Sequence, residues 1–204
     1  MALVREPDTD RIQATVKMDD QNAVSNAVCA ALDSVKTNGT FASFSEIRLQ
    51  HLPPVSVKDV GNIQYPLTED DARKIIDKAN QAPFGKGSKT LVDTSVRNTW
   101  ELNPHLFDAN TAAWKRMVDV LLGHVSQVFG IKERIRAEPY KMLLYQAGSF
   151  FKEHKDTNDK IPNMFGTMII ALPSDHTGGQ VRLKHADQEM WYRSDTYHSS
   201  VAFW

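Results

Sequence analysis

A histidine and an aspartate two positions apart, His154 and Asp156, are the residues whose types and spacing are best suited to chemistry. In an extended segment, side chains i and i+2 point to the same side, so the imidazole and the carboxylate would face one point. A third ligand from a distant strand would complete the facial triad of two histidines and one carboxylate that holds non-haem Fe(II). That triad leaves part of the coordination sphere open for a cosubstrate and O₂. Taken alone, the pair is explained equally well by two exposed loop residues.

The residues before this pair follow a longer pattern. Residues 145–156 have the form Y-x2-G-x2-F-x2-H-x-D, which resembles the Fe(II)- and 2-oxoglutarate-dependent oxygenases of the prolyl 4-hydroxylase-like superfamily. The likeness continues through residues 164–181, which are similar to the family's next core strand and to the Gly-Gly turn after it. Upstream, residues 96–102 and 136–145 are similar to fungal-type members. The resemblance covers residues 96–204 well and the N-terminal third poorly.

The resemblance implies roles for four residues. It makes His154 and Asp156 iron ligands. It makes Tyr145 the phenol that hydrogen-bonds the 2-oxoglutarate carboxylate, and it makes Thr167 a residue that faces the pocket from the next strand. Two other interpretations stay open: Tyr145 as a core aromatic with its hydroxyl at the surface, and Thr167 as a packing residue.

The activity implied by the resemblance is hydroxylation of a protein or small molecule, coupled to decarboxylation of 2-oxoglutarate to succinate. Its cofactors would be Fe(II), 2-oxoglutarate as cosubstrate, and ascorbate as a further candidate. The family pattern also requires a second iron histidine on a late strand, followed by a basic residue that binds the far carboxylate of 2-oxoglutarate. No histidine follows His198, which is a candidate substitute, and no arginine follows Arg193.

The chain ends in an apolar run, residues 201–204, that is typical of a buried strand, whereas domains commonly end in a polar tail. We therefore expect the N-terminal part of an oxygenase domain, truncated at its C-terminus and incomplete or inactive as this chain. A non-catalytic β-sandwich module derived from that family, acting through a protein contact, is the alternative. A third interpretation is a cupin-type metal-binding protein that uses other combinations of histidines: His154, His176, His185 and His198.

Hydrophobic periodicity predicts the elements that position these residues. Helical spacing covers residues 21–35, 72–79 and 113–129, with a capping box at 68–71 before the second and Asn110 as N-cap of the third. Candidate strands cover residues 41–49, 140–145, 164–172, 181–185 and 190–192, and a last strand begins near Ser199. We expect an α+β fold: a helical N-terminal half packed on a double-stranded β-helix (jelly-roll) core that is incomplete at its C-terminus. Its parts would be a polar arm (1–18), a mainly helical support region (19–130) and a partial jelly-roll oxygenase core (131–204).

Composition excludes several classes of protein. The 204 residues are 41% hydrophobic and 24% charged, which favours one globular domain. A formal net charge of −1 gives no polybasic signal for nucleic acid or an anionic membrane, and no apolar run approaches the ~18 residues of a membrane span. The N-terminus becomes charged at Arg5, too early for a secretory signal, and the single Cys29 suits a reducing compartment. We expect an intracellular, cytoplasmic protein of unknown substrate and oligomeric state.

Overall fold

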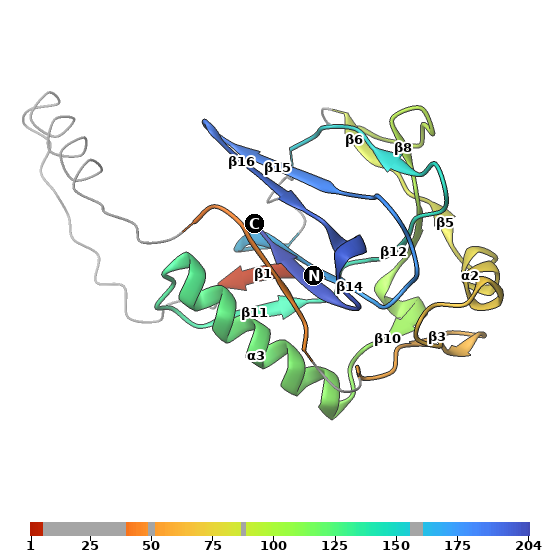
Figure 1. Ribbon diagram of the computed structural model, residues 1–204, viewed down its shortest axis with the longest axis horizontal. Coiled ribbons are helices and arrows are strands. Elements are labelled where there is room, and N and C mark those ends of the chain that lie inside the picture. Colours follow the sequence, from red (N-terminus) through yellow and green to blue (C-terminus); the bar gives the residue numbers. More distant parts are fainter. Residues whose placement is uncertain (6–39, 49–51, 87–88, 156–160) are drawn as a thin grey trace, which may run out of the picture.

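The largest sheet of the protein contains its first and last strands. The computed structural model describes residues 1–5, 40–48, 52–86, 89–155 and 161–204. Within them, five strands form an antiparallel sheet of order β11-β1-β14-β17-β2. Their bounds are β1 (Ala2–Arg5), β2 (Ser43–Glu46), β11 (Ile135–Glu138), β14 (Met164–Ala171) and β17 (Ser200–Phe203). The first strand therefore lies inside the sheet, between two strands from the second half of the chain (Figure 1).

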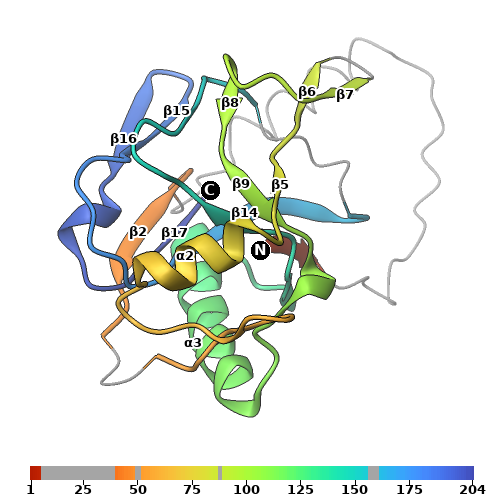
Figure 2. The same cartoon turned by 90° about the vertical axis from the view of Figure 1, so that its right-hand side faces the viewer.

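Helix α3 (Ala112–Phe129) packs on one face of this sheet (Figure 2). Val125 on its inner side is fully buried in the main apolar core. Phe203 of β17 meets two aromatic rings of the helix edge-on, with centroid distances of 5.6 Å to His124 and 5.2 Å to Phe129. Because edge-to-face contacts are favourable for aromatic rings, they fix the helix against β17 as well as burying it.

Both ends of α3 are capped. The Thr111 hydroxyl accepts a hydrogen bond from the Trp114 N–H at 3.3 Å, so Thr111, not the predicted Asn110, is the N-cap. At the other end Gly130 has a φ of 66°, a left-handed conformation that glycine adopts without steric cost. The predicted helix itself is confirmed, with its start shifted by the neighbouring hydroxyl.

Beyond the last residue of β17, the ladder between β14 and the chain end continues. The Thr167 N–H donates to the Trp204 carbonyl at 2.8 Å, and the Trp204 N–H donates to the Thr167 carbonyl at 3.1 Å. Gly166 permits this approach, because a Cβ there would lie 2.7 Å from the Trp204 carbonyl oxygen. All four residues of β17 are buried, which confirms the strand predicted near Ser199.

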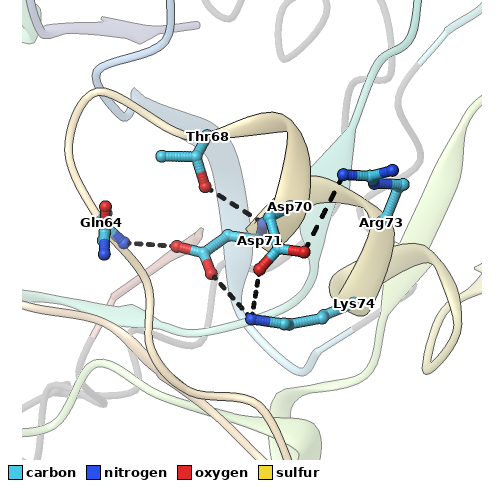
Figure 3. Close-up of polar contacts among 6 residues, drawn as sticks. All are labelled: Gln64, Thr68, Asp70, Asp71, Arg73 and Lys74. Carbon is cyan, nitrogen blue, oxygen red and sulfur yellow. Dashed lines mark hydrogen bonds and ion pairs between the residues drawn. The ribbon is translucent and has the colours of Figure 1, made fainter.

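Helix α2 (Glu69–Ile76) begins at the predicted capping box (Figure 3). The Thr68 hydroxyl accepts a hydrogen bond from the Asp71 N–H at 3.1 Å. The buried Asp71 carboxylate does not return to Thr68; it accepts from the backbone N–H of Gln64 at 2.9 Å. The cap is therefore confirmed, and it also ties the helix to the segment that precedes it.

The other strands form small sheets. Two have three strands each: β10 (Phe107–Asp108) with β3 (Ser56–Val57) and β4 (Gly61–Asn62), and β12 (Met142–Leu144) with β9 (Trp100–Leu102) and β5 (Asn80–Gln81). Three are pairs: β13 (Phe150–Phe151) with β8 (Arg97–Asn98), β15 (Val181–His185) with β16 (Gln188–Tyr192), and β6 (Phe84–Lys86) with β7 (Lys89–Leu91). Short 3₁₀ turns η1 (Pro104–Leu106) and η3 (Ser194–Thr196) precede β10 and β17.

The expected fold of a helical N-terminal half on a jelly-roll core is wrong. In the described part of residues 40–130, only α2 and α3 are α-helices, and short antiparallel strands alternate with them. The later strands do not form an evident jelly-roll: they are distributed over one five-stranded sheet and several sheets of two or three strands, and β11, β12, β13, β14 and β17 pair with strands from earlier in the chain. The expected regions 19–130 and 131–204 thus share sheets. Short polar segments became strands through partners distant in sequence, which the periodicity of a single segment does not reveal.

Some predicted features lie outside the described residues: the helix over 21–35 with Cys29, and most of the arm, of which residues 2–5 form β1. Among the described helices, none combines the length and the apolar character that crossing a membrane requires.

Candidate metal centre

The described part of the motif, residues 145–155, follows strand β12 and contains strand β13, and each of these strands has an antiparallel partner. β12 pairs with β9, with Leu144 opposite Trp100. β13 pairs with β8, with Phe151 opposite Arg97. One further hydrogen bond extends this ladder, because the Lys152 N–H donates to the Val96 carbonyl at 3.0 Å. The β8–β13 pair lies at the opposite end of the molecule from α3 (Figure 2). The two halves of the motif are thus held by one contiguous segment, residues 96–102.

A four-residue turn, 146–149, separates the two halves. The Ser149 N–H donates to the Gln146 carbonyl, and the Gln146 N–H donates to the Ser149 hydroxyl, both at 2.9 Å. The Trp100 indole N–H fixes the turn from the opposite strand by donating to the Gln146 side-chain oxygen at 2.6 Å. Gly148 has a φ of 77°, which explains a glycine at this place in the motif.

Three side chains form a stacked column at the end of β13. The His154 imidazole lies on the Phe151 ring, with centroids 3.6 Å apart and an interplanar angle of 17°. The Arg97 guanidinium lies 4.5 Å from the centroid of the same ring. Arg97 is held in turn by a 2.6 Å hydrogen bond from its Nη1 to the Pro83 carbonyl. The column joins the motif's phenylalanine and histidine to a cation on the opposite strand.

The exposed His154 ring is also oriented by the backbone. Its Nδ1 lies 2.8 Å from the Lys152 carbonyl oxygen, which can only accept, so Nδ1 carries the proton. In the neutral ring the lone pair is then on Nε2. Metal-binding histidines commonly have this arrangement, with one ring N–H donated to a carbonyl or carboxylate and the other nitrogen on the metal. The geometry of His154 therefore fits a metal ligand.

The other predicted site residues lie in different surroundings. Asp156 is outside the described residues. Tyr145, 51% exposed, follows β12 immediately before the turn, so it is not a core aromatic. Thr167 lies in β14 of the five-stranded sheet, half-buried, on the face opposite the buried Met168. Tyr145 and His154 thus share a ladder, whereas Thr167 belongs to another sheet.

The remaining histidines considered as ligands have their own contacts. Both ring nitrogens of His176 lie near oxygen atoms, Nδ1 at 2.8 Å from the Ser174 carbonyl and Nε2 at 3.1 Å from the Ser194 hydroxyl. His185 stacks on Phe41 with centroids 5.7 Å apart. His198 is exposed between η3 and β17. A metal bound through His176 would have to replace one of its two hydrogen bonds.

Charged side chains of the β15–β16 hairpin lie near the end of β13. Arg182 donates to the Glu189 carboxylate at 2.6 Å. This hydrogen bond and the charge of Glu189 raise the pKa of Arg182, and the carboxylate of Glu153 contributes in the same direction. Glu153 precedes His154, so the Arg182–Glu189 ion pair of the hairpin lies near the segment that carries the imidazole.

Across the part of the chain that the structure describes, no three His, Cys, Asp or Glu side chains are grouped to hold a metal ion. Sequence reasoning missed two contributors to the surroundings of His154: the contact role of Phe151, and Arg97. The three-residue spacing from Phe151 to His154 was a usable signal. No signal in the sequence pointed to Arg97, because its contact with Phe151 depends on the register between β8 and β13.

Comparison of the chain with models of known protein families, with curated proteins and with solved structures finds no match. Functional inference for this protein therefore depends on its own residues and their geometry.

Proposed function

We propose that this protein binds Fe(II) through His154 and Asp156 as part of a 2-oxoglutarate-dependent oxygenase site. The observation that carries the proposal is the orientation of the His154 imidazole. Its Nδ1 proton is directed to the Lys152 carbonyl, which leaves Nε2 in the form that binds a metal. The motif around it, with Tyr145 and Gly148 at the turn, adds support from the sequence.

The bound metal would supply a site at which O₂ and 2-oxoglutarate meet. The chain's own residues would hold and orient these groups. His154 would donate its Nε2 lone pair, and Asp156 a carboxylate oxygen. The Tyr145 hydroxyl, at the other end of the same ladder, would donate a hydrogen bond to a carboxylate of 2-oxoglutarate. Substrate oxygenation would be coupled to the conversion of 2-oxoglutarate to succinate and CO₂.

The test is Fe(II)-dependent formation of succinate from 2-oxoglutarate with ascorbate present, with Fe(II) binding measured anaerobically on the same samples. We expect His154→Ala to abolish turnover and to weaken Fe(II) binding at least ~10-fold. His105→Ala is the matched control, because His105 is an exposed histidine of η1, outside the motif. Equal turnover and equal Fe(II) binding in the wild type and His154→Ala would reject the proposal.

A second candidate function is that of a non-catalytic interaction module. The observation that favours it is the exposure of three large apolar side chains in or next to the consecutive strands β12 and β13: Leu143 (37%), Tyr145 (51%) and Phe150 (40%). Tyr145→Phe separates the two functions. Loss of the hydroxyl would raise the KM for 2-oxoglutarate in an oxygenase, whereas an apolar contact surface would be unchanged.

A further inference from the structure

We infer that Phe151 and Arg97 are positioning residues for the His154 imidazole, together fixing the direction in which its Nε2 approaches a metal ion. This inference rests on the proposed Fe(II) site and adds to it the residues that orient its imidazole. It also gives the motif's phenylalanine a physical role: the ring three positions before the histidine is the surface against which the imidazole lies.

An exposed imidazole has two rotatable bonds, and the hydrogen bond of Nδ1 does not by itself fix both of them. The contact from Nδ1 to the Lys152 carbonyl sets one edge of the ring. The Phe151 ring, 3.6 Å away and nearly parallel, sets the plane of the imidazole. The edge and the plane together define where the Nε2 lone pair points. A metal ligand that is oriented before the metal binds loses less side-chain entropy on binding.

Phe151 is itself held in place by a residue of the opposite strand. It is half-buried, and Arg97 is directly opposite it in the β8–β13 register. The Arg97 guanidinium lies 4.5 Å from the ring centroid, a cation–π distance, and is anchored to the Pro83 carbonyl at 2.6 Å. Its Nε is buried without a hydrogen-bond partner, so the guanidinium tolerates an unpaired donor in this position. This series of contacts begins at the Pro83 carbonyl, passes through Arg97 and Phe151, and ends at the His154 imidazole.

The experiment compares five substitutions in the full chain, of which three are in β13. Phe151→Leu removes the aromatic plane but keeps an apolar side chain, and Phe151→Tyr keeps the plane. Phe150→Leu is the matched control, because Phe150 is in the same strand with its side chain on the opposite side. Co(II) binding is followed by its visible absorption, and the His154 ring protons by NMR in metal-free protein, assigned with His154→Gln.

In the wild type, we expect the His154 ring protons to be displaced by the Phe151 ring current. Phe151→Leu should lose that displacement and bind Co(II) about 10-fold more weakly, the lower end of the range for residues that orient a ligand. Phe151→Tyr and Phe150→Leu should match the wild type in both measurements. Arg97→Lys should weaken Co(II) binding about 3-fold, since the cation–π contact is altered while the Phe151 ring stays. It serves as the second variant if Phe151→Leu does not fold.

Three results would overturn the inference, and the first two differ in what they say about the proposed site. If wild type binds Co(II) more tightly than His154→Gln but Phe151→Leu and Arg97→Lys bind like wild type, the positioning role is wrong and the metal site stands. If wild type and His154→Gln bind Co(II) equally, the proposed site fails and the positioning role fails with it. Weaker binding in Phe150→Leu equal to that in Phe151→Leu would show a general loss of β13 and would also overturn the inference.

Discussion

The Trp204 carbonyl oxygen lies 2.7 Å from the position that a Cβ of Gly166 would occupy. An alanine at 166 would therefore push on backbone that is also hydrogen-bonded to Thr167. We expect Gly166→Ala to lower the free energy of unfolding by about 1–3 kcal/mol, the usual cost of overpacking. Urea denaturation measures it. Gly85→Ala is the control, because no atom lies within 4 Å of a Cβ there. Equal effects at the two glycines would contradict the close approach.

At Gly123 we expect substitution by alanine to stabilise the protein. It lies inside α3, exposed, and a Cβ there would have open space around it. Alanine has a higher helix propensity than glycine, because it loses less backbone entropy on folding. Gly123→Ala should raise the free energy of unfolding by about 0.5–1 kcal/mol. Thermal and urea unfolding check this, and a lower stability of Gly123→Ala would contradict the open space around this position.

The cap of α2 can be removed by one substitution. Thr68→Ala deletes the hydroxyl that accepts the Asp71 N–H and leaves that donor unpaired at the helix start. We expect a loss of about 1 kcal/mol in the free energy of unfolding. Thr68→Ser keeps the hydroxyl and should retain most of the wild-type stability. If serine and alanine destabilise equally, the methyl group of Thr68, and not its hydrogen bond, is what matters.

Tyr65 makes stability depend on alkaline pH. Burial raises its pKa from 10.0 to about 12. The folded state therefore holds the phenol proton more tightly than the unfolded state. The corresponding stabilisation is complete below pH 10.0, decreases as the pH rises, and is lost near pH 12. Between pH 9 and pH 12, the urea concentration at the unfolding midpoint should fall less steeply with pH in Tyr65→Phe than in the wild type. Parallel curves for the two proteins would contradict a buried phenol.

Long elements with a clear period were predictable from the sequence, and short ones were not. Helix α3 and strand β14 carry their pattern over many residues, so local periodicity was sufficient. The four residues of β1 are too few to show a period. Ala2, Leu3 and Val4 are buried because β1 pairs with residues 135–138 and 164–167, which no local pattern reveals. The jelly-roll prediction was wrong for the same reason: pairing between distant strands was assumed by resemblance.

The local geometry of the candidate site follows more closely from the sequence than the pairing of distant strands does. Gly148 of the motif lies in a turn, and the exposure of His154 after β13 agrees with the interpretation of an exposed loop residue. The stacking of His154 on Phe151 follows from a spacing visible in the sequence, but the Arg97 contact requires the register of β8 against β13. The iron, its cosubstrate and the role of Asp156 stay predictions.

The central position of β1 also bears on how the protein folds. Its partners β11 and β14 come from the second half of the chain, and β2 pairs with residues 200–203. Closing loops of this length costs entropy before any hydrogen bond of the sheet is gained, and folds with such a high contact order form slowly. β1 therefore cannot pair before residues 135–138 have been synthesised. In this protein the order of synthesis is not the order of assembly.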